Sequence, residues 1–582
     1  MLIIAEKPSV ARKIASFLSN KFKVLSKFPP LIYFKLNNEK VYITSALGHL
    51  FTLSDLRKDM YYPSFNYKWV PAYIEDKIYV KKKFINILKR FRNENKIIIA
   101  TDYDIEGELI GYNILRFIFN RNNAYRMIFS AITRKDILYA FYNLKEMNLS
   151  FALAGETRHI VDWIYGINLS RALTKAIRHY VKKVVLSIGR VQGPTLKLVY
   201  EREREIESFK PEPYYLLFFQ TKAKFMYPNI IKDYKQALEL KNRCNNYLKI
   251  EKVIKKKVIL NPPYPYNLSD LQQDAWKLYR ISPKRTLDIA QKLYEQGYIS
   301  YPRTESQKLP FTINFREIFE SLSKINLYKE YIAITLRKEK LIPNNGPKDD
   351  VHPAIHPTGE IPKNLNKKEF LIYDLVVRRF IATFLDHSYY YYIKVLARSN
   401  DIPFIYEYKF KDRLLESEWI RVYWKIYSKE FESILFKEGE ILRGYPKIEK
   451  RYTEPPPRYS PASLVKKLEE LELGTKATRP QIVYILYKRR YIKGRKAIQI
   501  TTLGRVVIEI LEQYIPEIFS VELTRKLEKN LHLIEKGKVY LKEKTIEEAK
   551  EIVLQACSEI KEKEKEIGYK LYQKYKELKK KK

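Results

Sequence analysis

The chain has 582 residues, enough for about four domains of the usual ~150 residues each. Its net charge of +42 is spread along the whole length, which predicts a polyanionic partner, nucleic acid ahead of an anionic membrane surface. No apolar run approaches the ~20 residues that cross a bilayer, and Cys244 and Cys557 are too few for structural zinc or a disulfide framework, so we expect a soluble intracellular protein.

Strands and helices alternate over residues 1–148, which predicts an α/β domain. Leu2 to Ala5 is typical of a short buried strand, and Ser9 is placed to cap the first helix. A later apolar run, Ile97 to Ala100, predicts a second buried strand, and a helical pattern begins at Leu109.

The rest of the chain divides into helical, β-rich and inserted parts. Two stretches rich in alternating Tyr, Phe, Ile and Val predict one β domain that an insertion interrupts. Residues 269–301 and 463–492 each resemble a winged-helix unit of helix, turn, helix and strand. The basic tail Lys579 to Lys582 is expected to be solvated or to bind a phosphate backbone. The predicted domains are 1–148, 149–207 with 442–582 (helical), 208–262 with 388–441 (β-rich), and 263–387 (inserted).

Four carboxylates are packed into the seven residues from Asp102 to Glu108, directly after the strand at Ile97 to Ala100. Acids this close repel one another unless a hard cation lies between them, so the run suggests Mg²⁺, with a solvated acidic turn as an equally weighted alternative. Glu6 and Lys7 follow the first strand in the same way. We expect them at the same edge of the sheet.

An acid after the first strand and a DxDxE run after a later one resemble the Toprim domain, which topoisomerases, bacterial primases and some nucleases share. The string Gly297 to Ser306, with Tyr301, resembles the nucleophile motif of type IA DNA topoisomerases, and within that family the chain looks most like topoisomerase III and its archaeal relatives. The other segments that resemble this family, in its order, are Gly48-His49-Leu50, Arg158 with Asp162, Asn168-Leu169-Ser170-Arg171, Ser187-Ile188-Gly189-Arg190-Val191-Gln192, Leu271-Gln272-Gln273-Asp274-Ala275, His352-Pro353-Ala354-Ile355-His356-Pro357-Thr358 and Gly474-Thr475-Lys476-Ala477-Thr478-Arg479.

The resemblance implies a multidomain α/β plus α and β fold, with an N-terminal Toprim domain, winged-helix-like subdomains and the family's toroidal architecture. It also implies that Tyr301 attacks a phosphodiester to form a 5′ phosphotyrosine. Arg303 and Lys7 are expected to bind phosphate oxygens, and Arg303 shares a face with Tyr301 if the segment is extended. The remaining expected roles are proton transfer by Glu6, phosphate contact or proton relay by His352, and Mg²⁺ binding by Asp102, Asp104 and Glu106 together with Glu6.

DNA contacts are expected from further residues of the matching segments. For the arginines, structural ion pairs are the alternative, and Arg190 is the one we favour most strongly as a strand contact. The role of His356 is left open between a turn and a functional contact. The expected DNA-binding residues are His49, Arg158, Asp162, Arg171, Arg178, Ser187, Gly189, Arg190, Val191, Gln192, Thr478 and Arg479.

The resemblance implies relaxation of negative supercoils, decatenation, or both. ATP is expected to be unnecessary, because one bond is exchanged for another of similar energy, and no GxxxxGK[ST] loop is present. The expected substrate is single-stranded or negatively supercoiled DNA, and no membrane partner is expected. The protein is expected to be a monomer that lies in the cytoplasm in association with the nucleoid. The sequence leaves open whether a helicase is its partner. Many relatives carry Arg where this chain has Ile105, and the zinc modules of many relatives are missing. Two alternatives do not use Tyr301: a metal-dependent Toprim nuclease or primase, and a noncatalytic winged-helix DNA-binding protein.

Overall fold

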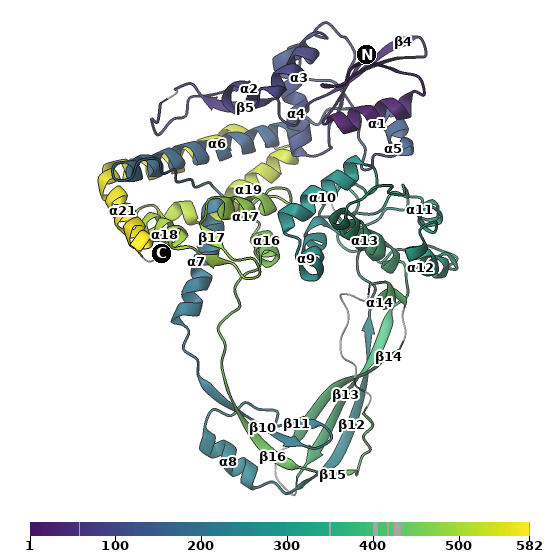
Figure 1. Ribbon diagram of the computed structural model, residues 1–582, viewed down its shortest axis with the longest axis vertical. Helices are drawn as coiled ribbons and strands as arrows, with labels where there is room; N and C mark the ends of the chain where they lie inside the picture. The colour runs from purple at the N-terminus through teal and green to yellow at the C-terminus, as the bar shows by residue number, and fades with distance from the viewer. Residues whose placement is uncertain are drawn as a thin grey trace.

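The computed structural model describes residues 1–57, 59–348, 351–399, 405–415, 418–423, 432 and 434–580. The chain forms a ring (Figure 1), with the N-terminal α/β domain at the top and a β-rich arch at the bottom. A helical part and an inserted part form the two sides of the ring. Residues 581–582 of the predicted tail, and parts of the predicted stretches 263–387 and 388–441, lie outside the described residues.

The N-terminal domain is built on a sheet of order β2-β3-β4-β1-β7-β8-β9. Both expected strands are confirmed: β1 (Leu2–Ala5) is buried and pairs in parallel with β7 (Ile97–Ala100). Because Ala5 lies opposite Ala100, the residues that follow the two strands leave the same edge of the sheet. The other elements are β2 (Lys23–Ser26), β3 (Leu31–Leu36), β4 (Glu39–Ser45), β5 (Phe51–Asp55), β6 (Tyr67–Pro71), α2 (Ala72–Glu75), α3 (Val80–Lys89), the π-helix η1 (Leu115–Phe119), β8 (Tyr125–Arg126), α5 (Arg134–Tyr142) and β9 (Lys145–Glu146).

Two helices in this domain start earlier than predicted. The expected Ser9 cap is wrong, because α1 (Pro8–Leu18) begins at Pro8, whose fixed φ and missing N–H suit the first helical position. Helix α4 (Ile105–Ile114) begins at Ile105 and not at Leu109, because Asp104 caps it by accepting a hydrogen bond from Gly107 N at 2.8 Å. The acidic run therefore spans a helix start.

The helical side of the ring joins residues from the middle and the end of the chain. Helix α6 (Leu149–Arg178) runs below the N-terminal domain, and α20 and α21 pack along it. No helix in the described part of the chain combines the length and the apolar character that a membrane crossing requires. The remaining helical elements are α7 (Gln192–Ser208), α16 (Pro461–Glu470), α17 (Arg479–Lys488), α18 (Thr502–Tyr514), η2 (Pro516–Phe519), α19 (Val521–Glu535), α20 (Leu541–Glu562) and α21 (Glu564–Lys580).

The arch is a single sheet of order β15-β12-β13-β14-β11-β10-β16. Leu260, at the end of β12, lies opposite Ser388, at the start of β13, so the inserted part leaves and re-enters the sheet at neighbouring positions. The arch therefore carries the inserted part on one end (Figure 1). Its elements are β10 (Pro213–Gln220), β11 (Lys224–Met226), α8 (Tyr234–Asn242), β12 (Tyr247–Leu260), β13 (Ser388–Arg398), β14 (Tyr406–Leu415), α14 (Glu418–Val422), β15 (Ile441–Arg443) and β16 (Tyr445–Tyr452).

Both predicted winged-helix units contain a helix, a turn and a second helix. In the C-terminal unit, α16 and α17 lead into a hairpin of β17 (Ile492–Lys493) and β18 (Gln499–Ile500). In the inserted part, Ile299 instead forms an isolated bridge with Pro357. The helices of the inserted part are α9 (Leu268–Tyr279), α10 (Pro283–Glu295), α11 (Phe315–Leu322), α12 (Asn326–Leu336) and α13 (Lys367–Ala382).

Candidate active site

Glu6 and Asp102 meet at the edge of the sheet where β1 and β7 end. The Glu6 carboxylate accepts a hydrogen bond from Asp102 N at 3.2 Å, and both side chains are buried. Burial, together with the negative charges of Asp102 and Asp104, raises the pKa of Glu6 to about 8. The pKa of Asp102 is raised as well, mainly by burial. The predicted convergence of these acids is therefore present, and one of them holds a proton at neutral pH.

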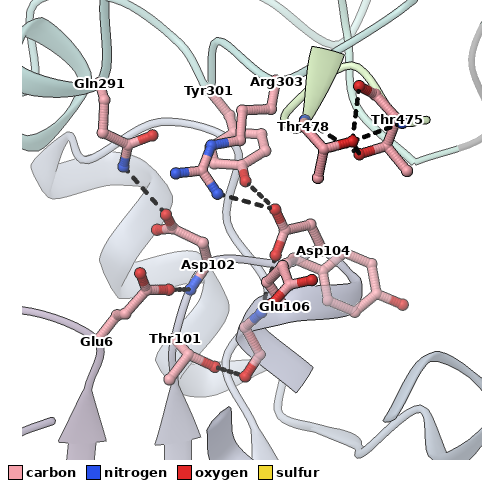
Figure 2. A network of polar contacts seen from close by, with 12 residues as sticks. Glu6, Thr101, Asp102, Asp104, Glu106, Gln291, Tyr301, Arg303, Thr475 and Thr478 are labelled. Carbon is pink, nitrogen blue, oxygen red and sulfur yellow. Dashed lines mark hydrogen bonds and ion pairs between the residues drawn. The ribbon is translucent and has the colours of Figure 1, made fainter. Parts of the chain in front are cut away.

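Tyr301 reaches this edge from the inserted part of the chain (Figure 2). Its hydroxyl donates to Asp104 Oδ2 at 2.5 Å, and Arg303 Nη1 lies 3.4 Å from the same oxygen. The side chain is 1% exposed, and Tyr301 N donates to Ser130 O at 2.7 Å. Burial and then the charge of Asp104 raise the pKa of Tyr301 well above its ordinary value, while Arg303 lowers it. In this closed arrangement the phenol is protonated, and a phosphate has to displace Asp104 to reach it.

His352 lies directly against Tyr301, with 4.5 Å between their ring centroids. A carbonyl oxygen can only accept, so His352 Nε2 donates to Tyr103 O at 2.8 Å, and the Ser130 hydroxyl lies 3.0 Å from Nδ1. His356 is different: it is buried beside Phe380, and burial lowers its pKa. The structure thus brings His352 to the site and leaves His356 in the core.

The expected metal-ligand set of Asp102, Asp104 and Glu106 with Glu6 is not gathered in one cluster. Asp104 faces Tyr301 and Arg303, whereas Asp102 accepts from Gln291 Nε2 at 3.1 Å. Glu106 lies in the first turn of α4, where each residue rotates by about 100°, so its carboxylate turns to another side. Its Oε2 atom lies 2.8 Å from His49 Nε2 and 2.9 Å from His159 Nε2. His49, expected at DNA, thus contacts an acid of the protein.

The acidic turn is held in place by residues that the DxDxE pattern does not contain. Arg126 forms a fully buried ion pair with Glu108 at 2.7 Å and donates to Asp102 O at 2.9 Å. Gly107 is needed because a Cβ there would lie 1.9 Å from Asp102 O. Together with Arg303 near Asp104, Arg126 supplies positive charge in a turn where Ile105 offers none.

The site opens into a cavity of about 430 Å³, which residues of the N-terminal domain, the inserted part and the C-terminal helical part line. Lys7 and Arg303 line this cavity, as does Thr478, which closes a turn with Thr475 at 3.0 Å. Lys7 is paired with Glu295 of α10, and Arg479 Nη1 lies 3.3 Å from Glu305. The cavity thus brings the predicted Lys7, Arg303 and Thr478 to one space, where the two cations can bind phosphate oxygens.

The arginines expected to bind DNA have protein partners. Arg190, the one favoured most strongly, has a side chain only 1% exposed and lies 2.8 Å from both Asp162 and Glu528. Arg158 pairs with the same Glu528 at 2.9 Å, and Arg171 pairs with Asp55. Burial alone would raise the pKa of Glu528, but the guanidinium groups of Arg158 and Arg190 lower it to about 2. In this closed state Arg158, Arg171 and Arg190 therefore act as structural ion pairs.

The other predicted DNA contacts lie near these ion pairs. Arg178 is exposed and donates to Val184 O at 3.3 Å. Ser187 N donates to the Tyr491 hydroxyl at 3.1 Å, and Val191 is buried. Gln192 begins α7, and Gly189 O accepts from Gly193 N at 2.9 Å. These residues form the junction of α6 and α7, and their role toward DNA stays a prediction.

Sequence reasoning missed several partners of the site: Gln291, Glu295, His159, Arg126 and Glu528. None of them lies in a string that marks it as functional. The only sequence feature that indicated such partners was the acidic run from Asp102 to Glu108, because buried carboxylates require hydrogen-bond donors or cations elsewhere in the fold.

The chain was compared with protein-family models. Residues 1–132 match the Toprim domain, and residues 146–545 match the DNA topoisomerase family. A Toprim domain implies divalent-metal binding. The expected Toprim fold class is thereby confirmed.

Curated relatives and a solved structure agree with these matches. The protein named DNA topoisomerase 1 of Pyrococcus horikoshii is 45% identical over 98% of this chain and 86% of its own length. The one of Methanocaldococcus jannaschii is 39% identical over 97% of this chain and 75% of its own length. The structure of full-length topoisomerase I from Thermotoga maritima superimposes with a TM-score of 0.74 at 26% identity, covering 94% of this chain and 89% of that one. The ring architecture is thus shared with a solved relative.

Proposed function

Because this chain belongs to the type IA DNA topoisomerase family, we propose that Tyr301 is the nucleophile of a reversible cleavage of one DNA strand. The enzyme is an isomerase that relaxes negative supercoils without ATP. The observation that carries the assignment is the hydrogen bond of the Tyr301 hydroxyl to Asp104, since it joins a motif of the inserted part to the Toprim acids. Neither a Toprim nuclease nor a noncatalytic binding protein requires that contact.

The reaction exchanges one phosphodiester for another. The Tyr301 oxygen forms a bond to phosphorus as the bond from phosphorus to the 3′ oxygen breaks. Once a phosphate has displaced Asp104, the phenolic proton passes to water, and Glu6, which is protonated at neutral pH, is placed to give a proton to the leaving 3′ oxygen. Arg303 and Lys7 bind the charge that develops on the phosphate oxygens. Resealing is the reverse of these steps, so the cycle of cleavage and resealing needs no ATP.

The donor set at the sheet edge fits Mg²⁺. Glu6, Asp102 and Asp104 offer hard carboxylate oxygens, and burial first, then the charge of the neighbouring carboxylates, raises the pKa values of Glu6 and Asp102. We assign the three carboxylates as the groups that would hold the ion, with Glu106 outside the set. When bound, Mg²⁺ would neutralise the acids and hold the phosphate of the cut strand for resealing.

The protonation of Glu6 gives cleavage a defined pH dependence. With a pKa of about 8, against an ordinary 4.5, the carboxyl keeps its proton below pH 8 and loses it above. We expect the single-turnover rate of cleavage, measured without a divalent metal, to fall as the pH rises through about 8. Glu6→Gln, which cannot transfer a proton, should be roughly 10²- to 10³-fold slower and lack this decline. An unchanged pH profile in Glu6→Gln would remove Glu6 from proton transfer.

Strand passage requires the inserted part to move away from the rest of the ring. Contacts that must break include Ser269 Oγ to Glu469 Oε2 at 2.5 Å, Arg479 to Glu305, and Lys7 to Glu295. These contacts are polar, and the inserted part is joined to the ring covalently through β12 and β13 of the arch. We assign residues 263–387 as the moving part, 208–262 with 388–441 as its hinge, and 149–207 with 442–582 as the part that holds DNA.

Locking this gate should separate cleavage from strand passage. In a chain with Cys244→Ser and Cys557→Ala, we expect a short reducible bis-thiosulfonate between Ser269→Cys and Glu469→Cys to abolish relaxation of supercoiled plasmid. Cleavage of a single-stranded oligonucleotide should persist, and reductant should restore relaxation. The control pair Glu207→Cys and Arg505→Cys, at an ion pair within the helical side of the ring, should relax plasmid when linked. Relaxation by the locked Ser269/Glu469 enzyme would contradict this assignment of the gate.

The proposal also covers the oligomeric state, the location, the partner and the preferred substrate of the enzyme. Every group assigned to the reaction comes from one chain, so a monomer suffices; light scattering on the purified protein tests this. The substrate places the enzyme with the nucleoid in the cytoplasm. Because the sequence has no nucleotide-binding loop, strand separation on relaxed DNA requires a partner such as a helicase. Single-stranded or negatively supercoiled DNA is the favoured substrate, and decatenation follows from the same gate.

A further inference from the structure

One cluster of metal-ligating side chains lies beside the active site but is not used by the reaction. Of the described residues, only His49, Glu106 and His159 form a group of three or more such ligands, with their ligand atoms within 4.8 Å of one another. They come from the β4–β5 connection, the first turn of α4 and the middle of α6. Both imidazoles direct Nε2 at the same oxygen, at 2.8 and 2.9 Å, and their ring centroids are 4.8 Å apart.

The chemistry of these donors differs from that of the neighbouring acids. Two imidazole nitrogens and one carboxylate suit a borderline ion such as Zn²⁺ or Co²⁺, whereas Mg²⁺ prefers oxygen ligands alone. Ligand atoms of a tetrahedral zinc site lie roughly 3.3 Å apart, as expected from metal–ligand bonds of about 2.0–2.1 Å. The Nε2–Oε2 separations in the cluster are 2.8 and 2.9 Å, so small side-chain shifts would admit an ion.

The cluster is also accessible. The three side chains are 26%, 28% and 31% exposed, so an ion can enter and keep at least one coordination position open to water. The three residues sit on separate elements that the fold already holds together, because α4 and α6 pack against each other. A site assembled before the ion arrives needs little reorganisation to bind it.

We propose that His49, Glu106 and His159 bind a divalent transition-metal ion of the Zn²⁺ class, at a site distinct from the carboxylates Glu6, Asp102 and Asp104. The acidic run would then serve two ions of different hardness, with Asp102 and Asp104 on one side and Glu106 on the other. A cysteine count cannot reveal such a site, since it uses no thiolate. The inference does not rest on the proposed DNA cleavage, and it is tested without DNA.

The test is a binding measurement on the full chain after removal of metals with EDTA. Equilibrium dialysis against Zn²⁺ in excess Mg²⁺ should show one bound ion per chain, and Co²⁺ should give visible d–d absorption that Zn²⁺ removes. Trp69 reports locally, because its ring centroid lies 6.0 Å from that of His159, so Co²⁺ should quench its fluorescence. Trp69→Phe should remove the quenching while leaving the dialysis result unchanged.

His49→Gln and His159→Gln separate metal binding from hydrogen bonding. Glutamine keeps an N–H that can donate to Glu106 but is a poor ligand for Zn²⁺, so we expect affinity to fall at least roughly 100-fold in each variant. The matched control is His179→Gln, since His179 lies directly after the end of the same helix and its Nε2 pairs with the carboxylate of Glu564; this variant should bind Zn²⁺ as the wild type does. His159→Gln with wild-type affinity would overturn the inference, as would a wild type that takes up no Zn²⁺.

A second measurement needs no variant. Zn²⁺ should protect His49 and His159 of the wild type from diethylpyrocarbonate, mapped by mass spectrometry, while His179 stays reactive. Equal modification of His49, His159 and His179 with and without Zn²⁺ would overturn the inference. The outcome is separate from that for the proposed function, because a covalent Tyr301–DNA adduct can form whether or not Zn²⁺ binds.

Discussion

Replacing Tyr301 with phenylalanine is expected to abolish plasmid relaxation and the covalent DNA adduct together. Loss of a nucleophile that no neighbouring group replaces costs on the order of 10⁴-fold or more in rate. The ring of phenylalanine can keep its contacts with His352 and Tyr294, so the fold should lose only one hydrogen bond, about 1 kcal/mol. The measurement uses 5′-labelled and internally labelled single-stranded oligonucleotide with Mg²⁺, followed by denaturation and electrophoresis.

Tyr294→Phe is the matched control for this experiment. Tyr294 is as buried as Tyr301, and its ring centroid lies only 5.2 Å away. Adduct in Tyr294→Phe and none in Tyr301→Phe identifies the nucleophile among two adjacent candidates. If Tyr301→Phe still forms an adduct or relaxes negatively supercoiled plasmid, the proposed mechanism is wrong. Cleavage without any adduct in the wild type would instead favour the metal-dependent nuclease.

The part of the site that follows strand ends was predictable from the sequence. Two short apolar runs had to be buried strands, and acids directly after parallel neighbouring strands share one edge. This logic placed Glu6 next to Asp102 without any knowledge of the fold. Tyr301 could be placed there only through the family resemblance, since nothing in its local sequence indicates which edge it meets.

The side-chain partners could not be predicted, because they depend on elements far away in the chain. Glu106 sits 57 and 53 residues from His49 and His159, and no short spacing connects them. The sequence predicts that Arg190 contacts a DNA strand, with a structural ion pair as the alternative, and it cannot show that Glu528, 338 residues later, lies against it. A charge pattern gives the composition of a surface, whereas burial of a particular charge is decided by which helix packs over it.

The same distance effect explains why Glu106 lies apart from the other three predicted metal ligands in this structure. In the sequence, Asp102, Asp104 and Glu106 look equivalent, because they alternate as side chains do on one face of a strand. The chain is instead turning from a strand into a helix there, and Asp104 is the cap. Alternate residues then point in different directions, so Glu106 turns toward His159, while Glu6, already part of the predicted set, meets Asp102 from the first strand.

Substituting Asp102→Asn and Asp104→Asn together is expected to impair resealing far more than cleavage. The two amides keep the size of the side chains but remove two of the three carboxyl groups that would hold Mg²⁺. We expect Mg²⁺-dependent relaxation to fall roughly 10²- to 10³-fold, corresponding to about 3–4 kcal/mol of lost transition-state stabilisation. The covalent Tyr301–DNA adduct should accumulate, because the variant keeps Glu6, Lys7 and Arg303, on which its formation depends. Quantifying adduct and relaxed plasmid across a Mg²⁺ titration measures both effects.

The control for this double variant removes the same charge elsewhere. Asp76→Asn with Asp386→Asn changes two exposed acids and should leave the Mg²⁺ dependence unaltered. Glu106→Gln distinguishes the two ions: it should leave the Mg²⁺ requirement of resealing near that of the wild type, because its carboxylate faces His49 and His159. If Glu106→Gln shifts the Mg²⁺ requirement as strongly as the Asp102 and Asp104 pair does, Glu106 belongs to the catalytic metal set, and α4 must rotate when DNA and Mg²⁺ bind.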